Sequence, residues 1–385
     1  MKVEVKAGNV ASFTTPLVVV NLFKDVKKPG GATGAVDKAI NKAISKAISA
    51  GEIKGNLGET LLFHTIDNIP AERVLVVGLG TASDFGPEEI RRAAASAVWA
   101  AEKLSVKKMT TIVHGAGIGG MKPKLAAEAT ALGSLLAAYR FDKYKKDEDK
   151  KKPALEHLTI LERDGNKIDD FASGVVDANA IAWAQNLARE LVNEPSNVMT
   201  PIEFSLRLEK EVKALGAEVK VFDEKWIQGK GMNLLWGVAK GSSHMPRLVQ
   251  IRYQGGKKTD PWIGLIGKGV MFDSGGISLK GSSGMEAMKG DMGGGAAVAG
   301  AVLAAIKLGV QANILALIPA VFNSPGANAQ NPGDIIKGLD GPAVEIISTD
   351  AEGRLIMADA LSYARESGAD YLVDIATLTG ASVVA

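Results

Sequence analysis

The sequence predicts an α/β protein of two domains, each built on a sheet flanked by helices. Short apolar runs alternate with segments of helical periodicity along the chain, a pattern typical of mainly parallel sheets that are covered on both faces. A run of charged residues closed by a proline, at 142–153, indicates an exposed linker. The 385 residues also exceed the usual size of one domain. We therefore expect an N-terminal α/β domain over 1–152 and a C-terminal α/β domain over 153–385.

The first domain is expected to contain three buried strands and a helix. The apolar runs at 17–23, 73–80 and 109–117 indicate the strands. Between the first two, residues 34–51 carry apolar side chains at every fourth position and lysines on another face. This pattern predicts one amphipathic helix that ends at Gly51, and packing on a sheet is favoured over a membrane surface.

The second domain is expected to begin with a long helix and to continue with strands separated by helices. Helical spacing extends over 166–192 and stops before Pro195, because the residue preceding a proline avoids the α region. Strands are then predicted at 218–223, 247–253, 262–270, 313–322, 343–349 and 371–377.

Composition restricts the chemistry that the chain can perform. There is no cysteine, which excludes disulfides, thiolate zinc sites and cysteine nucleophiles. The four histidines are far apart in the sequence, so a metal would be held mainly by oxygen ligands. The start of the chain lacks a secretory pattern, and the longest apolar stretch, 292–306, is shorter than a membrane span. We expect a cytoplasmic protein without a membrane partner.

Charge is distributed unevenly between the two predicted domains. Residues 1–152 carry 24 Lys and Arg against 16 Asp and Glu, and residues 153–385 carry 21 against 27. The basic first part leaves DNA binding open as an alternative function, and the acidic second part could concentrate carboxylates around cations. On charge alone, solvated surfaces are the favoured explanation of both biases.

The segment GAGIGG at 115–120 matches the glycine spacing of a dinucleotide-binding fingerprint. No second strand ending in an acidic residue follows it, as that fingerprint requires. We interpret it as a tight turn between a strand and a helix, with cofactor binding as the minor alternative.

Charged side chains gather in two glycine-rich segments that follow predicted strands. The segment 264–295 contains Lys268, Asp273, Lys280 and Asp291, and the segment 348–355 contains Asp350, Glu352 and Arg354. On an extended backbone the last three side chains would project from one face. Because both segments follow predicted buried strands, we expect them to meet at the carboxyl edge of the sheet.

The four carboxylates predict a centre for two divalent cations. Asp273, Asp291, Asp350 and Glu352 carry four negative charges, which two dications held by bridging carboxylates would balance. The alternative is a set of surface salt bridges with the neighbouring lysines and arginine. Either segment alone would favour that alternative, and the two together favour the metal centre.

The chain resembles the leucyl aminopeptidase (cytosol aminopeptidase) family. The resemblance rests on ARELVNEPSNVMTP, GKGVMFDSGGISLK, MKGDMGG, PGDII, TDAEGRL and TLTGA, all within 188–381. It implies that Asp273 and Glu352 contact both metals, that Asp350 completes one metal site, and that Lys268 and Asp291 complete the other. The implied metals are Zn²⁺ or Mn²⁺.

The resemblance also implies how peptides would be hydrolysed. Lys280 would polarise the scissile carbonyl, and Arg354 would hold a bicarbonate ion as general base for a metal-bridging water. Met288 would line the pocket for the apolar side chain, and Thr377 and Gly380 would lie in a turn that contacts the substrate. Lys268, Asp273 and Lys280 would contact the substrate as well.

The family implies removal of N-terminal leucine and other apolar residues from peptides by a homo-hexamer. Two positions depart from its pattern: Ser348 replaces the usual Asn, and FNSP stands at 322–325. Relative to the family, the catalytic domain over 153–385 is incomplete at its C-terminus. A catalytically inactive homologue is therefore a further alternative.

Overall fold

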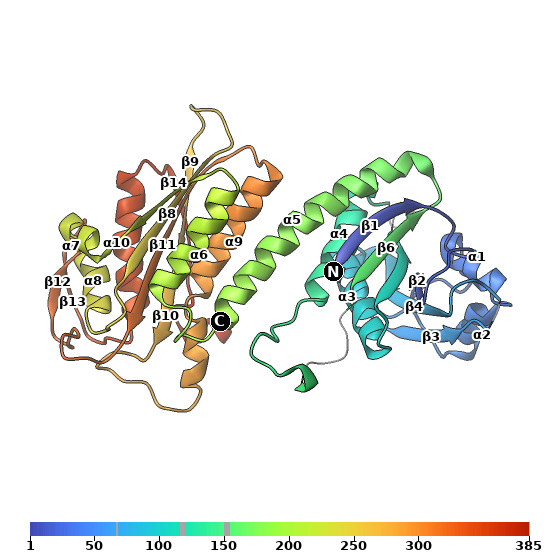
Figure 1. The fold of residues 1–385 in the computed structure, drawn as a ribbon, viewed down its shortest axis with the longest axis horizontal. Helices are drawn as coiled ribbons and strands as arrows, with labels where there is room; N and C mark the ends of the chain where they lie inside the picture. Colours follow the sequence, from blue (N-terminus) through green and yellow to red (C-terminus); the bar gives the residue numbers. More distant parts are fainter. Residues whose placement is uncertain (67, 116–119, 150–154, 385) are drawn as a thin grey trace. The chain divides into compact units, whose positions relative to one another are not determined.

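The computed structural model describes residues 1–66, 68–115, 120–149 and 155–384. The chain forms two compact units, Met1–Ala182 and Trp183–Ala385, and the division falls within α5 (Ile168–Asn193), close to the helix predicted at 166–192 (Figure 1).

This division lies later in the chain than the predicted boundary at residue 152. The reason is β6 (His157–Glu162), which pairs in parallel with both β1 (Lys2–Ala7) and β5 (Lys108–Ile112) inside the first sheet. The charge run at 142–153 therefore connects two elements of the first unit, although its residues 150–153 lie outside the described part.

The first unit contains a six-stranded sheet in the order β1-β6-β5-β2-β4-β3. Strands β2 (Val18–Phe23) and β4 (Arg73–Gly80) match two predicted strands, and β3 (Thr60–His64) pairs antiparallel with β4. All other neighbours in this sheet are parallel. The third predicted strand, 109–117, is observed as β5. Residues 116–119 of the GAGIGG segment lie outside the described residues.

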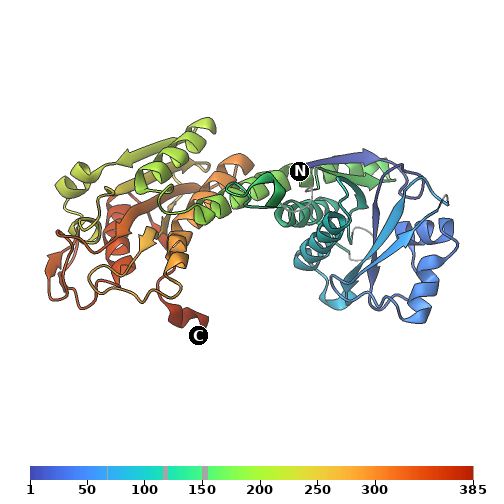
Figure 2. The ribbon, with the colours of Figure 1, turned by 60° about the horizontal axis from the view of Figure 1, so that its bottom comes forward.

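Helices cover both faces of the first sheet, as strand alternation requires. Val18 and Val20 of β2 pack in the cluster that holds α1 (Gly31–Ala39) and α2 (Ala43–Ala50). Val19 packs on the opposite side with α3 (Pro87–Lys103) and α4 (Pro123–Ala137). Figure 2 shows the sheet between these two groups of helices.

The single helix predicted over 34–51 is in fact two helices. Asn41 and Lys42 adopt φ of 58° and 57° between α1 and α2, a left-handed conformation that interrupts a right-handed helix. The Asp37 carboxylate accepts hydrogen bonds from the backbone and the hydroxyl of Ser45 and thereby fixes the turn. The predicted C-cap is confirmed, since Gly51 is left-handed and its N–H bonds the carbonyls of the last turn.

The second unit contains a mixed sheet in the order β14-β9-β11-β8-β7, with β10 also paired to β11. The pairs β14–β9, β9–β11 and β10–β11 are parallel, whereas β8 is antiparallel to both β11 and β7. Its strands are β7 (Glu218–Phe222), β8 (Arg247–Gln254), β9 (Trp262–Gly267), β10 (Gly269–Asp273), β11 (Asn313–Asn323) and β14 (Tyr371–Ile375). The predicted parallel character therefore holds for one half of the sheet, and the half at β8 and β7 is antiparallel.

Helices pack on both faces of this sheet as well (Figure 1). One core cluster joins α6 (Pro201–Ala214) and α9 (Gly293–Leu308) to the sheet. The other joins α7 (Glu224–Lys230), α8 (Asn233–Ala239) and α10 (Glu352–Glu366) to the opposite face. Five short 3-10 helices complete the described elements: Ala82–Asp84, Asp147–Asp149, Gly165–Lys167, Met285–Gly290 and Gly380–Val383.

The strand predicted at 343–349 does not belong to the main sheet. Only Ala343–Glu345 is extended, as β13, and it pairs antiparallel with β12 (Ile335–Lys337) in a separate small sheet. Its apolar residues are therefore not a buried strand of the main sheet. The acidic segment that follows is held at the end of β11 by a hydrogen bond from Asn323 to the carbonyl of Thr349.

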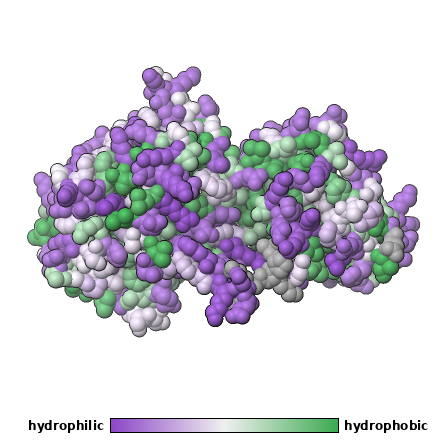
Figure 3. Space-filling view, in the orientation of Figure 1, coloured by the Kyte–Doolittle hydropathy of each residue, from purple (hydrophilic) through white to green (hydrophobic). Residues whose placement is uncertain are grey.

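One helical stretch among the described residues, Met285–Leu308, is apolar and long enough to span a membrane by length and composition alone. In the protein, 61% of its most apolar window is buried, and Val298 and Val302 of α9 belong to the core of the second unit. The stretch therefore has the character of a core helix. Hydrophilic side chains predominate on the face drawn in Figure 3.

His114, two residues after the end of β5, is a buried titratable group of the first unit. Its side chain is 1% exposed, and Nδ1 lies 3.2 Å from Nδ2 of Asn21. Because the amide Nδ2 can only donate, Nδ1 must be the acceptor of a neutral imidazole. Burial lowers the pKa of His114 to about 4.

We predict that acid destabilises the first unit through His114. The folded state binds this proton less tightly than the unfolded chain, whose His pKa is about 6.5, so the free energy of unfolding falls as the pH drops towards 4, by about 3 kcal/mol in total. Urea unfolding between about pH 7 and pH 4.5 measures this loss, and the variant His114→Gln should lack it. An equal pH dependence in both proteins would contradict the prediction.

Candidate metal centre

The site begins at Lys268, where the strand predicted at 262–270 is interrupted. Lys268 separates β9 from β10; its N–H donates to the carbonyl of Ile375 in β14, and its own carbonyl accepts from the N–H of Gly295 in α9. Its side chain is almost fully buried. The Nζ lies 2.9 Å from Oδ1 of Asp291 and 2.8 Å from Oε1 of Glu352, and it donates to the carbonyl of Thr377 at 2.9 Å.

Two glycines allow this close packing. A Cβ on Gly294 would lie 2.0 Å from the carbonyl oxygen of Ile375, so only glycine lets the start of α9 approach β14. A Cβ on Gly353 would lie 2.8 Å from both Cε and Nζ of Lys268. Gly353 therefore makes room for the lysine amine next to Glu352.

Asp273, at the end of β10, is held from two sides. Its Oδ1 accepts from the N–H of Gly275 at 2.9 Å and from Nδ2 of Asn323 at 2.8 Å. Its Oδ2 lies 2.9 Å from Nζ of Lys280. Asn323, at the end of the neighbouring strand β11, also donates to the carbonyl of Thr349 at 3.0 Å. It thus connects the strand end to the second acidic segment.

Thr349 ties that acidic segment to the loop after β10. Its Oγ1 donates to the carbonyl of Gly275 at 2.6 Å and accepts from the N–H of Ser278 at 2.8 Å, while its N–H donates to Oγ of Ser278 at 3.1 Å. These bonds bring Asp350, the next residue, against Nζ of Lys280.

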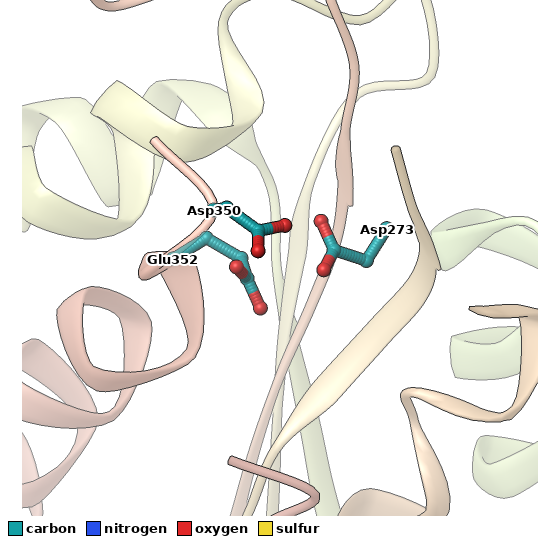
Figure 4. A group of neighbouring side chains, drawn as sticks. All are labelled: Asp273, Asp350 and Glu352. Carbon is teal, nitrogen blue, oxygen red and sulfur yellow. The ribbon is translucent and has the colours of Figure 1, made fainter. Parts of the chain in front are cut away.

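Asp350, Glu352 and Arg354 do not lie on extended backbone as predicted. Helix α10 begins at Glu352, so alternate residues point in different directions. Asp350 and Glu352 face Asp273 from the loop and the first turn of the helix (Figure 4). The side chain of Arg354 is exposed, and no ion pair of its guanidinium is found in the part of the chain that the structure describes.

The six remaining predicted charges form one group. Carboxylate oxygens of Asp273, Asp350 and Glu352 lie within 4.8 Å of one another. The four carboxylates carry four negative charges, and Lys268 and Lys280 supply two positive ones, which leaves an excess of two. Burial of this excess raises the pKa of Glu352 to about 7 and also raises the pKa of Asp291.

Divalent cations fit this group of ligands. Oδ2 of Asp291 and Oε2 of Glu352 are buried without a hydrogen-bond partner among the described residues, an arrangement that costs free energy unless a cation or proton binds there. Carboxylate oxygens are hard ligands that suit Mn²⁺ and Zn²⁺. Burial alone would lower the pKa of Lys268, but Glu352 and Asp291 outweigh it and raise that pKa. Ligation by the neutral amine therefore requires metal binding to release this proton.

The three other predicted residues lie at the border of the group. Met288 is half-buried in the 3-10 helix before Asp291, whose N–H donates to its carbonyl. Thr377 donates its hydroxyl to Oδ1 of Asp291 at 2.7 Å, so it positions a carboxylate as well as Lys268. Gly380 begins the last 3-10 helix and is exposed; no hydrogen bond to the charged group is found for it among the described residues.

Sequence reasoning missed the residues that orient these side chains. Asn323 lies in the departure at 322–325, and Thr349 and Gly353 lie in the segment 348–355, but no role is predicted for any of the three. Asn323 ends a buried strand one residue after Phe322, and a polar residue in that position is the signal that could have identified it.

Comparison with known proteins agrees with this geometry. The model of the catalytic domain of the cytosol aminopeptidase family matches residues 186–385, and the model of its N-terminal domain matches residues 19–148. The chain belongs to the cytosol aminopeptidase family. It is accordingly an aminopeptidase, a hydrolase that depends on divalent metal.

The match to individual relatives covers most of the length of each relative. A probable cytosol aminopeptidase of Alkaliphilus oremlandii is 37% identical over 385 residues, which cover 100% of this chain and 77% of the relative. One from Solibacter usitatus is 42% identical over 337 residues, or 87% of this chain and 68% of the relative.

Solved structures are similar as well. The bottromycin maturation enzyme BotP in complex with Mn has a TM-score of 0.81 and 31% identity, covering 97% of this chain and 74% of that one. A mutant of tomato leucine aminopeptidase has a TM-score of 0.86 and 26% identity, covering 100% of this chain and 75% of that one.

We predict that Gly353→Ala weakens divalent-metal binding. The new methyl group would displace the Lys268 amine, and disturbing the support of a metal ligand typically costs about 10–100-fold in affinity. Helix stability should not fall, because alanine is a better helix former than glycine. Calorimetric titration with Mn²⁺ measures the affinity.

Gly281→Ala is the matched control, since a Cβ at Gly281 meets no atom within 4 Å. If both variants bind Mn²⁺ as tightly as the wild type, Gly353 has no part in placing Lys268.

Proposed function

We propose that this aminopeptidase removes N-terminal leucine and other apolar residues from peptides at a centre of two metal ions held by Lys268, Asp273, Asp291, Asp350 and Glu352. The observation that carries the proposal is the pair of buried, unpartnered oxygens on Asp291 and Glu352 inside a group with two excess negative charges. A surface salt-bridge network would leave neither feature, because its carboxylates are solvated or paired.

Each ligand has an assigned place in the proposal. Asp273 and Glu352 would contact both metals, Asp350 would complete one site, and Lys268 and Asp291 would complete the other. The nearness of Asp273, Asp350 and Glu352 supports the first set, and the contacts of Lys268 with Asp291 and Glu352 support the second. Bound Zn²⁺ or Mn²⁺ supplies activation of water and a Lewis acid for the substrate.

Lys280 is proposed to act on the scissile carbonyl as a cation. Burial alone would lower its pKa, but the hydrogen bonds with Asp350 and Asp273 outweigh burial and raise it, so the ammonium keeps its proton at neutral pH. Its side chain is 25% exposed and can reach a substrate. An ammonium donor at the carbonyl oxygen stabilises the negative charge that develops there during attack.

Arg354 is proposed to hold a bicarbonate ion that takes the proton from the attacking water. The planar guanidinium fork suits a planar anion. Its position in the first turn of α10, two residues after Glu352, and its exposed side chain support this role.

Met288 and the turn at Thr377 and Gly380 are proposed to contact the substrate. Met288 is half-buried beside Asp291, and a flexible apolar side chain there suits the leucine side chain of a substrate. Hydrogen bonds of Thr377 with Asp291 and Lys268 support a place for this turn next to the metals. Lys268, Asp273 and Lys280 would contact the same substrate.

A homo-hexamer, a cytoplasmic location and DNA binding by the basic residues 1–152 stay predictions. Size determination in solution tests the first, fractionation of cells the second, and salt-dependent binding of duplex DNA the third.

Hydrolysis of leucine p-nitroanilide tests the proposed function. We expect turnover that is lost on chelation and restored by Zn²⁺ or Mn²⁺, with about two metal ions per chain in the active protein by elemental analysis. Glu352→Gln should lose both metal and turnover. Full activity in the chelated protein, or none in the metal-loaded protein, would refute the proposal; the second result is expected from an inactive homologue.

Separate variants test the roles of the two cations. Lys280→Met should lower kcat about 10²–10³-fold while metal content stays unchanged, because it removes a donor to the developing charge. Arg354→Ala should abolish a dependence of wild-type activity on added bicarbonate. A variant at Lys280 that changes only KM, or a wild type indifferent to bicarbonate, would show that the respective role is wrong.

A further inference from the structure

The first unit contains a cavity that the peptidase site does not use. Its volume is about 370 Å³, within the range of small-molecule sites, about 300–1,000 Å³. All of its lining residues belong to Met1–Ala182. They come from the carboxyl ends of β1, β2, β5 and β6 and from the start of α1.

The strand order places this cavity where open α/β sheets bind ligands. From β2 the chain continues to β3 and β4 on one side, then crosses to β5 and β6 on the other side of β2. The connections therefore reverse direction between β2 and β5, and Asn21 and Phe23 of β2 line the cavity together with Ile112 and Val113 at the end of β5. The crevice outside such a reversal is the usual ligand site of these folds.

The start of α1 offers hydrogen-bond donors to the cavity. Gly30 is the N-cap and has no side chain that could bond the first turn. The first intrahelical bond there is from the N–H of Gly34 to the carbonyl of Gly30, so the N–H groups of Gly31, Ala32 and Thr33 lack helical partners. All three residues line the cavity, and a helix N-terminus favours anions.

A hydrogen bond to strand β2 holds helix α1 in this position. The hydroxyl of Thr33 is buried and donates to the carbonyl of Asn21 at 2.7 Å. This bond holds the first turn of α1 against the end of β2, so its donors need no rearrangement before a ligand binds.

Two cations line the same cavity. Arg163 and Lys167 follow β6. Arg163 is exposed and has no ion pair among the described residues, whereas Nζ of Lys167 lies 3.7 Å from Oδ2 of Asp164. The nearby carboxylate of Glu162 is already engaged, since its Oε1 accepts from the N–H groups of Arg163 and Asp164 at 2.7 and 2.8 Å. The charged lining residues Glu162, Arg163 and Lys167 together carry a net charge of +1.

Apolar side chains form part of the remaining wall, which Asn9 and Asn21 also line. Val10, Phe23 and Leu161 are buried core residues whose surfaces border the cavity. A ligand that fills it would therefore combine an anionic group with a flat or apolar part, which is the composition of a nucleoside phosphate.

We propose that the first unit binds a nucleoside monophosphate in this cavity, with the phosphate at the N-terminus of α1 near Arg163 and Lys167 and the base against Val10, Phe23 and Leu161. The lining residues of this cavity belong to the first unit, whereas the proposed metal ligands belong to the second.

Calorimetric titration of the metal-loaded, full chain with AMP, adenosine and inorganic phosphate tests this proposal. AMP should bind tightest, and Gly30→Asp should weaken it at least about tenfold, because the new carboxylate takes the helix donors and repels phosphate. The variant should remain as stable as the wild type, since Asp is a favoured N-cap and a Cβ at Gly30 meets no atom within 4 Å. Arg163→Glu should weaken AMP binding similarly.

Gly229→Asp in α7 is the matched control, because it adds the same charge where a Cβ also meets no atom within 4 Å; it should bind AMP like the wild type. Absence of binding by all three probes would overturn the proposal. Undiminished AMP binding by Gly30→Asp would also overturn it, since the nucleotide would then occupy another place, such as the metals of the second unit.

Discussion

The site in the second unit depends on one constraint, the balance of charge around Lys268 and Glu352. Four carboxylates meet two lysines at the carboxyl edge of the parallel half of the sheet. A buried excess of negative charge is costly unless cations compensate it. The two unpartnered oxygens on Asp291 and Glu352 show where this compensation is incomplete. The same imbalance that weakens the metal-free fold thus provides the driving force for binding dications.

The surrounding fold supports this balance through backbone geometry. The break between β9 and β10 turns Lys268 inward, and glycines at 294 and 353 let helices α9 and α10 approach within contact distance of it. Asn323 and Thr349 then fix the two acidic segments to each other. Oriented support of this kind is what gives a metal site its geometry. The support comes from neutral residues, which leaves the carboxylates available for cations.

Much of this arrangement could be predicted from the sequence. Six of the predicted strands lie within a few residues of observed ones, and the long helix α5 was expected over almost its whole length. Local periodicity carries that information because burial of one face imposes it. The family resemblance supplied the assignment of Lys268 and Asp291 to one site, and in the structure they are in contact. The prediction that Arg354 lies on extended backbone was wrong, because helix α10 begins at Glu352. The charged residues alternate along this segment of the sequence, and that alternation does not indicate a helix start.

The sequence by itself determined which side chains could hold a cation and in which kind of layered fold they would lie. Only the tertiary structure decided that β6 joins the first sheet and that the segment 343–349 lies outside the second. It also decided that Oδ2 of Asp291 and Oε2 of Glu352 have no hydrogen-bond partner among the described residues. The physical reason is that pairing and desolvation depend on neighbours distant in the chain, whereas propensity and periodicity depend on adjacent residues. The cavity at the end of β2 is of the same kind, since four strands and one helix must assemble before it exists.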